Sequence, residues 1–188
     1  MIRRVLPCPW TRTTAPASTS KAPLGFFSAA RQGRKDDVEL GKGLWRRAYD
    51  RFTRGLDRYH QILEGVEDES LYAELRQIGD DLSALAGRVR EVCVAAQRRA
   101  PSEGLDIPGS LAGVHRALST AGNSLATTAE AAAMLRLSPG PVPAGAESVR
   151  RRAASVLEQV EDAERRLAEA AAIDGAVRAP GAGPEIPG

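Results

Sequence analysis

The chain has few aromatic residues, two cysteines and no long apolar segment. Aromatic side chains make up only 4% of the 188 residues, whereas hydrophobic residues as a whole make up 43%. A core of small aliphatic side chains favours closely packed helices over a β-sandwich, which needs β-branched and aromatic residues. No apolar run approaches the ~20 residues needed to cross a bilayer. Because Cys8 and Cys93 do not form a disulfide framework, we expect a reducing compartment and a cytoplasmic location.

Acidic residues are absent from the first 35 positions, which instead contain four prolines and seven basic residues (Arg3, Arg4, Arg12, Lys21, Arg31, Arg34 and Lys35). With no helical or strand period, residues 1–35 are expected to form a disordered basic arm. The body over residues 36–174 carries a net charge of −5, so attraction to phosphate or anionic lipid belongs to the arm. An Arg-rich, acid-free start also fits a mitochondrial transit peptide, and a true start near Leu24 is a second alternative.

Four segments carry apolar residues at alternating steps of four and three, the spacing of coiled-coil-like helix packing. They begin at Trp45, Leu71, Leu111 and Val149. They predict helices over about residues 37–66, 70–99, 110–137 and 146–173. Short connections favour antiparallel neighbours. We therefore expect an all-α, antiparallel up-down-up-down four-helix bundle over residues 36–174, with a disordered N-terminal arm and a disordered C-terminal tail over 175–188.

The ends of these helices are marked less clearly than their apolar faces. The apolar step from Val66 to Leu71 is five residues, which favours a hairpin; the alternative is one continuous helix of about 60 residues. The expected N-caps are Asp36 or Asp37 for the first helix, Ser70 for the second and Ser110 for the third.

Side chains that could carry chemistry are scattered and incomplete. Asp57, His60 and Glu64 share a helix face, as ligands of bundle di-iron sites do, but the second Glu-x-x-His pair is missing because Ala112 precedes His115 by three. Cys93 lies among apolar neighbours, which favours an inert thiol. The stretch Gly41-Lys42-Gly43 lacks phosphate-loop spacing, and no Gly-x-Ser-x-Gly elbow is present. We predict no catalytic, metal or cofactor residues, with an enzyme using an unrecognised inter-helix site as an alternative.

Arg150, Arg151 and Arg152 form a cluster near the start of the fourth predicted helix. Clustered arginines can hold phosphate, but positive charge near a helix N-terminus opposes the helix dipole. Acidic residues follow, and the cluster faces mostly away from the apolar seam. The sequence therefore favours a solvated charged face.

The third helix suggests a binding surface, because small residues flank its apolar seam on both sides. Two interpretations stay open: a second copy or another protein docks on a candidate face formed by Ala112, Ser119, Gly122, Ala126, Ala129 and Ala133, or these small side chains are simply tolerated in water and enriched by codon bias. The leading expectation is a non-enzymatic helical protein-interaction module. The alternative is weak association with an anionic membrane or, less favoured, nucleic acid through Phe26, Phe27, Arg31, Arg34 and Lys35 of the arm.

Overall fold

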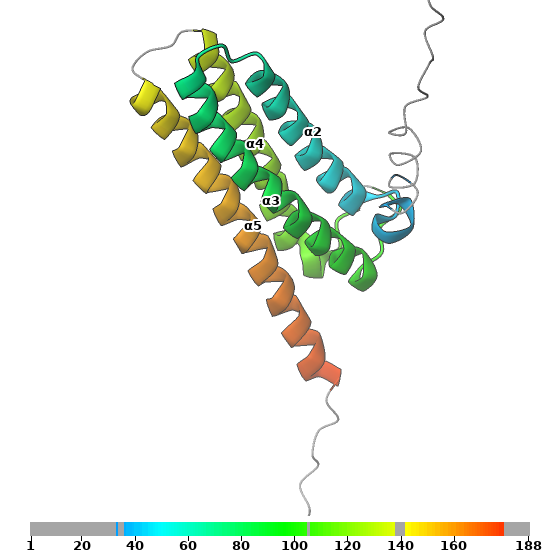
Figure 1. The fold of residues 1–188 in the computed structure, drawn as a ribbon. Coiled ribbons are helices and arrows are strands. Elements are labelled where there is room, and N and C mark those ends of the chain that lie inside the picture. The colour runs from blue at the N-terminus through cyan, green and yellow to red at the C-terminus, as the bar shows by residue number, and fades with distance from the viewer. Residues whose placement is uncertain (1–32, 34–35, 105, 138–141, 179–188) are drawn as a thin grey trace, which may run out of the picture.

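The computed structural model describes residues 33, 36–104, 106–137 and 142–178, and every regular element in these residues is a helix. The four long helices are α2 (Leu44–Glu64), α3 (Glu69–Arg99), α4 (Ala112–Leu137) and α5 (Val142–Arg178). A short 3₁₀ helix, η1 (Gly109–Leu111), precedes α4, and residues 36–40 form a short helical segment before α2. The prediction of an all-helical chain is confirmed for these residues (Figure 1). Apart from residue 33, the predicted disordered arm lies outside the described residues, as does most of the predicted tail.

The core is built from the apolar seams that the sequence shows. Trp45, Leu82, Leu118 and Val160, one from each long helix, are at most 2% exposed and belong to a single hydrophobic cluster. The seam of α3 is buried throughout, whereas that of α5 becomes partly exposed toward its end. The apolar periodicity therefore identifies the inward faces of all four helices.

Neighbouring helices joined by the shortest connections run in opposite directions. The Tyr59 hydroxyl of α2 donates a hydrogen bond to the Leu75 carbonyl of α3 at 2.9 Å, near the turn that joins them. At the other end of this pair, Trp45 Nε1 donates to the Ala100 carbonyl at 3.0 Å. The chain turns between Glu64 and Glu69, so the hairpin alternative holds and a continuous long helix is wrong.

Two further neighbouring pairs run parallel, which differs from the expected arrangement. The helices α3 and α5 run in the same direction, because the numbers of their contacting residues rise together: Glu74 pairs with Arg150, and Arg88 pairs with Glu164. The numbers of contacting residues also rise together along α2 and α4, so these two helices are parallel as well. Both α2 and α5 make extensive contacts with α3 and with α4. Therefore α3 and α4 lie at diagonally opposite corners of the bundle. The connection from Arg99 to Gly109 is long enough to cross the bundle end, because an extended residue spans about 3.3 Å.

The observed helix ends correct the expected ones. The first long helix begins at Leu44 and not near residue 37, because Gly41 has a φ of +66° and interrupts the helix. The N-cap of α3 is Asp68 and not Ser70; its carboxylate accepts a hydrogen bond from the Leu71 amide at 2.7 Å. Ser110 lies within η1.

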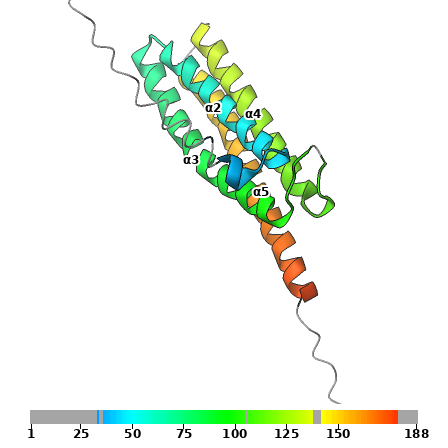
Figure 2. The same ribbon diagram turned by 90° about the vertical axis from the view of Figure 1, so that its right-hand side faces the viewer.

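The last long helix is longer than expected, since it spans residues 142–178 and not 146–173. Figures 1 and 2 show its C-terminal part, in orange and red, extending past the ends of the other helices. Residues 171–176 are all exposed there. The surface grooves described below all follow α5, because its sides are covered only in part by α3 and α4.

Candidate functional site

His60 and Ser83 form the contact that most resembles a catalytic dyad. Ser83 Oγ lies 3.2 Å from His60 Nε2, within the reach expected for a nucleophile and its base. The Ser83 hydroxyl, however, donates to the Gly79 carbonyl at 2.7 Å, so its proton is directed into its own helix. Ser83 then accepts from the histidine ring, and the pair joins α2 to α3 instead of activating an oxygen. Asp57 and Glu64 are exposed and take no part in it.

Neither Cys93 nor the Gly41–Gly43 stretch has the environment that catalysis or phosphate binding needs. Burial raises the pKa of Cys93 to about 12, which suppresses the thiolate needed for nucleophilic attack. In the described part of the chain, no three His, Cys, Asp or Glu side chains converge as metal ligands would. Gly41 supplies a left-handed backbone conformation, and Gly43 lies so close to Ser102 that a Cβ would overlap the Ser102 carbonyl.

The predicted docking face on α4 is engaged in part within the chain itself. Gly122 and Ala129 are buried, and the Arg51 side chain of α2 lies directly over Gly122. These two residues are therefore unavailable to a partner, because the small residues let α2 pack closely against α4. The other four predicted residues, which are Ala112, Ser119, Ala126 and Ala133, are partly exposed. The predicted contacts of the arm, Phe26 to Lys35, lie outside the described residues.

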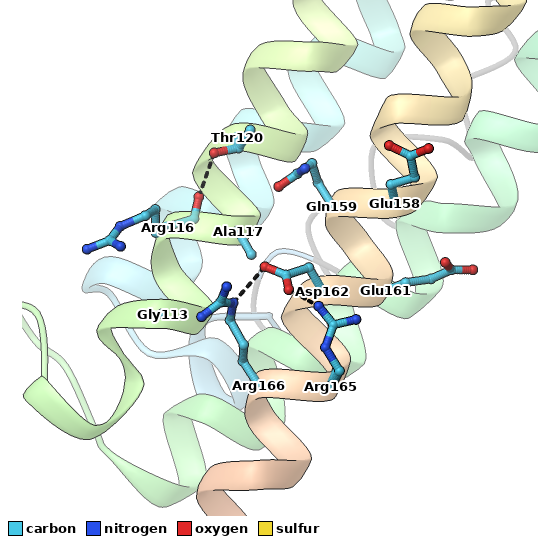
Figure 3. A pocket seen from close by; sticks show the side chains of 10 residues that line it. All are labelled: Gly113, Arg116, Ala117, Thr120, Glu158, Gln159, Glu161, Asp162, Arg165 and Arg166. Carbon is cyan, nitrogen blue, oxygen red and sulfur yellow. Dashed lines mark hydrogen bonds and ion pairs between the residues drawn. The ribbon is translucent and has the colours of Figure 1, made fainter.

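A groove of about 570 Å³ runs between α4 and α5 at the end nearer η1 (Figure 3). Its charges are balanced internally, because Asp162 of α5 accepts hydrogen bonds from Arg166 at 2.6 Å and from Arg165. The bond from Arg166 contributes most to holding the pKa of Asp162 below its usual value. The lining as a whole contains three arginines (Arg116, Arg165 and Arg166) and three carboxylates (Glu158, Glu161 and Asp162), so the groove carries no net charge of either sign.

A second groove, of about 320 Å³, lies on the same α4–α5 side nearer the start of α5 and differs in chemistry. It is lined only by hydroxyl and guanidinium side chains: Ser124 and Thr127 from α4, and Ser148, Arg151, Arg152 and Ser155 from α5. We call it the Arg151 groove. Its α5 residues follow helical spacing at i, i+3, i+4 and i+7, which places them on one face of the helix. The arginine cluster is therefore divided, since Arg150 instead faces α3 and pairs with Glu74.

The third groove, between α3 and α5, is apolar. Its first part, of about 360 Å³, is lined mainly by Ile78, Leu82, Leu85, Ala153, Ala154 and Leu157. A second part, of about 410 Å³, continues along the same two helices with Val92, Ala95, Leu167, Ala168 and Ala171. We call the two parts together the α3–α5 groove. Leu157 stands outside the α5 seam and is 37% exposed, so an apolar residue off the seam was the sequence signal that could have located this groove.

A charged pair separates the two parts of the α3–α5 groove. Arg88 donates to both carboxylate oxygens of Glu164, from Nε at 2.8 Å and from Nη2 at 2.7 Å. This two-bonded geometry is the strongest form of an arginine–carboxylate pair. The hydrogen bond from Arg88 is the main cause that lowers the pKa of Glu164. A ligand along the full groove would meet apolar surface in both parts, the Arg88–Glu164 pair between them, and further charged side chains (Asp81, Glu91, Arg99 and Arg150) in the lining.

Comparison with protein-family models, with curated proteins and with solved structures finds no match to this chain. Within the described residues, no helix is both long enough and apolar enough to pass through a bilayer. The function must therefore be argued from the surfaces themselves.

Proposed function

We propose that this protein is a non-enzymatic helical interaction module that docks an amphipathic helix of a partner in the α3–α5 groove. The observation that carries the proposal is the apolar lining of this groove, in which Leu157 of α5 remains exposed beside Leu82 and Leu85 of α3. Apolar grooves rimmed by polar side chains are typical of protein–protein interaction sites. The four packed helices, whose direction alternates in chain order, supply the frame on which such docking occurs.

The dimensions and side chains of the groove suit a helix. From Ile78 to Arg99 it follows α3 for about 30 Å at 1.5 Å per residue, which corresponds to about six helical turns. Alanines on α5, among them Ala154 and Ala168, allow a partner backbone to approach closely. We expect partner residues spaced at i, i+3, i+4 and i+7 to contact the two apolar parts. A polar partner residue would face the Arg88–Glu164 pair.

Two arginine substitutions test this surface against the α4 face that the sequence alone favours. Ala154→Arg places a long charged side chain in the α3–α5 groove, whereas Ala126→Arg places the same side chain on the partly exposed part of α4. The tagged full chain and both variants would be used to capture partners from the source cells. Each captured protein would then be purified and its binding measured directly.

The proposal expects a partner that binds the wild-type chain and the Ala126→Arg variant but loses at least about tenfold in affinity with Ala154→Arg. Sedimentation of each protein alone shows whether the partner is a second copy. Equal binding by all three proteins would refute docking in this groove. Loss only with Ala126→Arg would move the interface to α4.

A second candidate function is weak association of the N-terminal segment with anionic membranes. It rests on the charge distribution, because residues 1–35 contain seven basic residues and no acidic residue. Attraction of this kind weakens as salt is added, whereas apolar helix docking does not. Sedimentation with anionic liposomes, with and without residues 1–35, tests it; equal partitioning of the two proteins would exclude it.

A further inference from the structure

The Arg151 groove differs from the other charged surfaces described above because no carboxylate lines it. Its lining side chains carry only hydroxyl and guanidinium groups. The other α5 arginines whose side chains the structure describes are matched by carboxylates. Arg150 pairs with Glu74 and Glu147, while Arg165 and Arg166 share Asp162. Among the residues that the structure describes, Arg151 and Arg152 form no ion pair and no hydrogen bond to a carboxylate. They therefore do not serve to hold the helices together.

The hydroxyl groups of the groove are also largely uncommitted. Thr127 Oγ1 donates to the Ser124 carbonyl at 2.9 Å, which is a local bond within α4. The side-chain hydroxyls of Ser124, Ser148 and Ser155 make no hydrogen bond within the described part of the protein. Each of these can donate one hydrogen bond to a ligand oxygen. Ser148 and Ser155 lie on either side of the arginine pair along α5, and Ser124 and Thr127 face them from α4.

From this arrangement we propose that the Arg151 groove binds a phosphate group, carried by a small phosphorylated molecule. Two guanidinium groups supply paired N–H donors that match two oxygens of a phosphate, and the surrounding hydroxyls can donate to the others. A phosphomonoester carries a charge of about −1.5 to −2 near pH 7, which two arginines balance. The volume of about 320 Å³ accommodates a compact ligand and leaves the rest of a larger molecule in solvent.

This site is independent of the interaction surface proposed above. The α3–α5 groove lies on the other side of α5, where Arg150 contacts α3. The site is also independent of the basic arm, which contributes none of its lining residues. Substitutions at Arg151 and Arg152 therefore change one surface and leave the other two intact.

The test uses the full chain and two double variants with matched charge. Arg151→Gln/Arg152→Gln removes both unpaired guanidinium groups, and Arg165→Gln/Arg166→Gln removes the same charge from the neighbouring groove. Inorganic phosphate and glycerol 3-phosphate are titrated at low salt while backbone amide NMR shifts are recorded. In parallel, each protein is sedimented with phosphatidylcholine vesicles that contain phosphatidic acid, to distinguish a lipid headgroup from a free solute as the source of the phosphate.

We expect soluble phosphate to shift the amides of Ser148 and Ser155. The Arg151→Gln/Arg152→Gln variant should bind at least about tenfold more weakly, because each charge-assisted hydrogen bond is worth more than a tenfold change in affinity. The Arg165→Gln/Arg166→Gln variant should bind as the wild type does. Vesicle binding without soluble binding, lost in the first variant alone, would assign the same chemistry to a lipid headgroup. No binding in either arm, or equal weakening in both variants, would overturn the proposal.

Discussion

Ser102, in the connection from α3 to α4, caps the first turn of α2. Its hydroxyl oxygen accepts a hydrogen bond from the Leu44 amide at 3.3 Å. The residue at the N-cap position of α2, Gly43, has no side chain that could make this bond. Ser102 is itself held by Gln97, whose side-chain oxygen accepts from the Ser102 amide at 3.0 Å. The Ser102 hydroxyl therefore does two things: it holds the connection from α3 to α4 against the start of α2, and it satisfies a backbone amide in the first turn of α2.

Ser102→Ala should reduce the free energy of unfolding by about 1–2 kcal/mol, because the buried Leu44 amide loses its acceptor. Urea denaturation of the variant and the wild type measures this difference. Ser70→Ala is the matched control, since Asp68 and not Ser70 caps α3 and Ser70 is exposed. We expect that control to remain within about 0.5 kcal/mol of the wild type. Equal losses from the two substitutions would contradict capping by Ser102.

Two Gly→Ala substitutions should have opposite effects on stability. At Gly43 a Cβ would overlap the Ser102 backbone, so Gly43→Ala should destabilise the protein by more than about 1 kcal/mol. At Gly87, an exposed position inside α3, a Cβ meets nothing, and Gly87→Ala should stabilise the protein by about 0.5–1 kcal/mol through helix propensity. Thermal unfolding followed by circular dichroism measures both. Destabilisation by Gly87→Ala would show that α3 is covered at that point.

Phe52 is the largest contribution of the middle of α2 to the core, and it is 1% exposed. Phe52→Ala should cost about 3–5 kcal/mol, because it removes buried apolar surface and leaves a cavity. Tyr72→Ala removes an aromatic ring of similar size from α3 at a position that is 40% exposed, and should cost less than about 1 kcal/mol. Similar losses for the two variants in denaturant titrations would show that the seam of α2 does not face the interior.

The inward faces of the helices could be predicted because burial of apolar surface dominates folding and leaves a periodic pattern in the sequence. Every seam residue predicted for α3, from Leu71 to Ala96, is buried. The diagonal placement of α3 and α4 could not be predicted in the same way. A connection of about ten residues reaches a neighbouring helix or a diagonal one, and the apolar pattern is the same in both cases.

The predicted binding face shows a second limit of the sequence pattern. Small residues such as Gly122 permit close approach by a partner or by another helix of the same chain, and the sequence does not distinguish the two. Here Arg51 of α2 covers Gly122. The grooves beside α5 were missed because they depend on which helices flank α5, which is a property of the tertiary arrangement. Their only local signals were Leu157 outside the seam and the serines spaced around Arg151 and Arg152.

His115 should make stability depend on pH below about 7. Its ring lies edge-on to Trp45, with centroids 6.3 Å apart, and partial burial followed by the positive charge of Arg51 lowers its pKa in the folded protein. In the unfolded chain a histidine takes up a proton near pH 6.5. Below that pH the unfolded state binds more protons than the folded state, so the free energy of unfolding should fall as pH falls. His115→Gln should flatten this part of the profile in urea titrations, whereas His60→Gln, which leaves His115 in place, should retain it. An unchanged slope in the His115→Gln variant would assign the dependence to other groups.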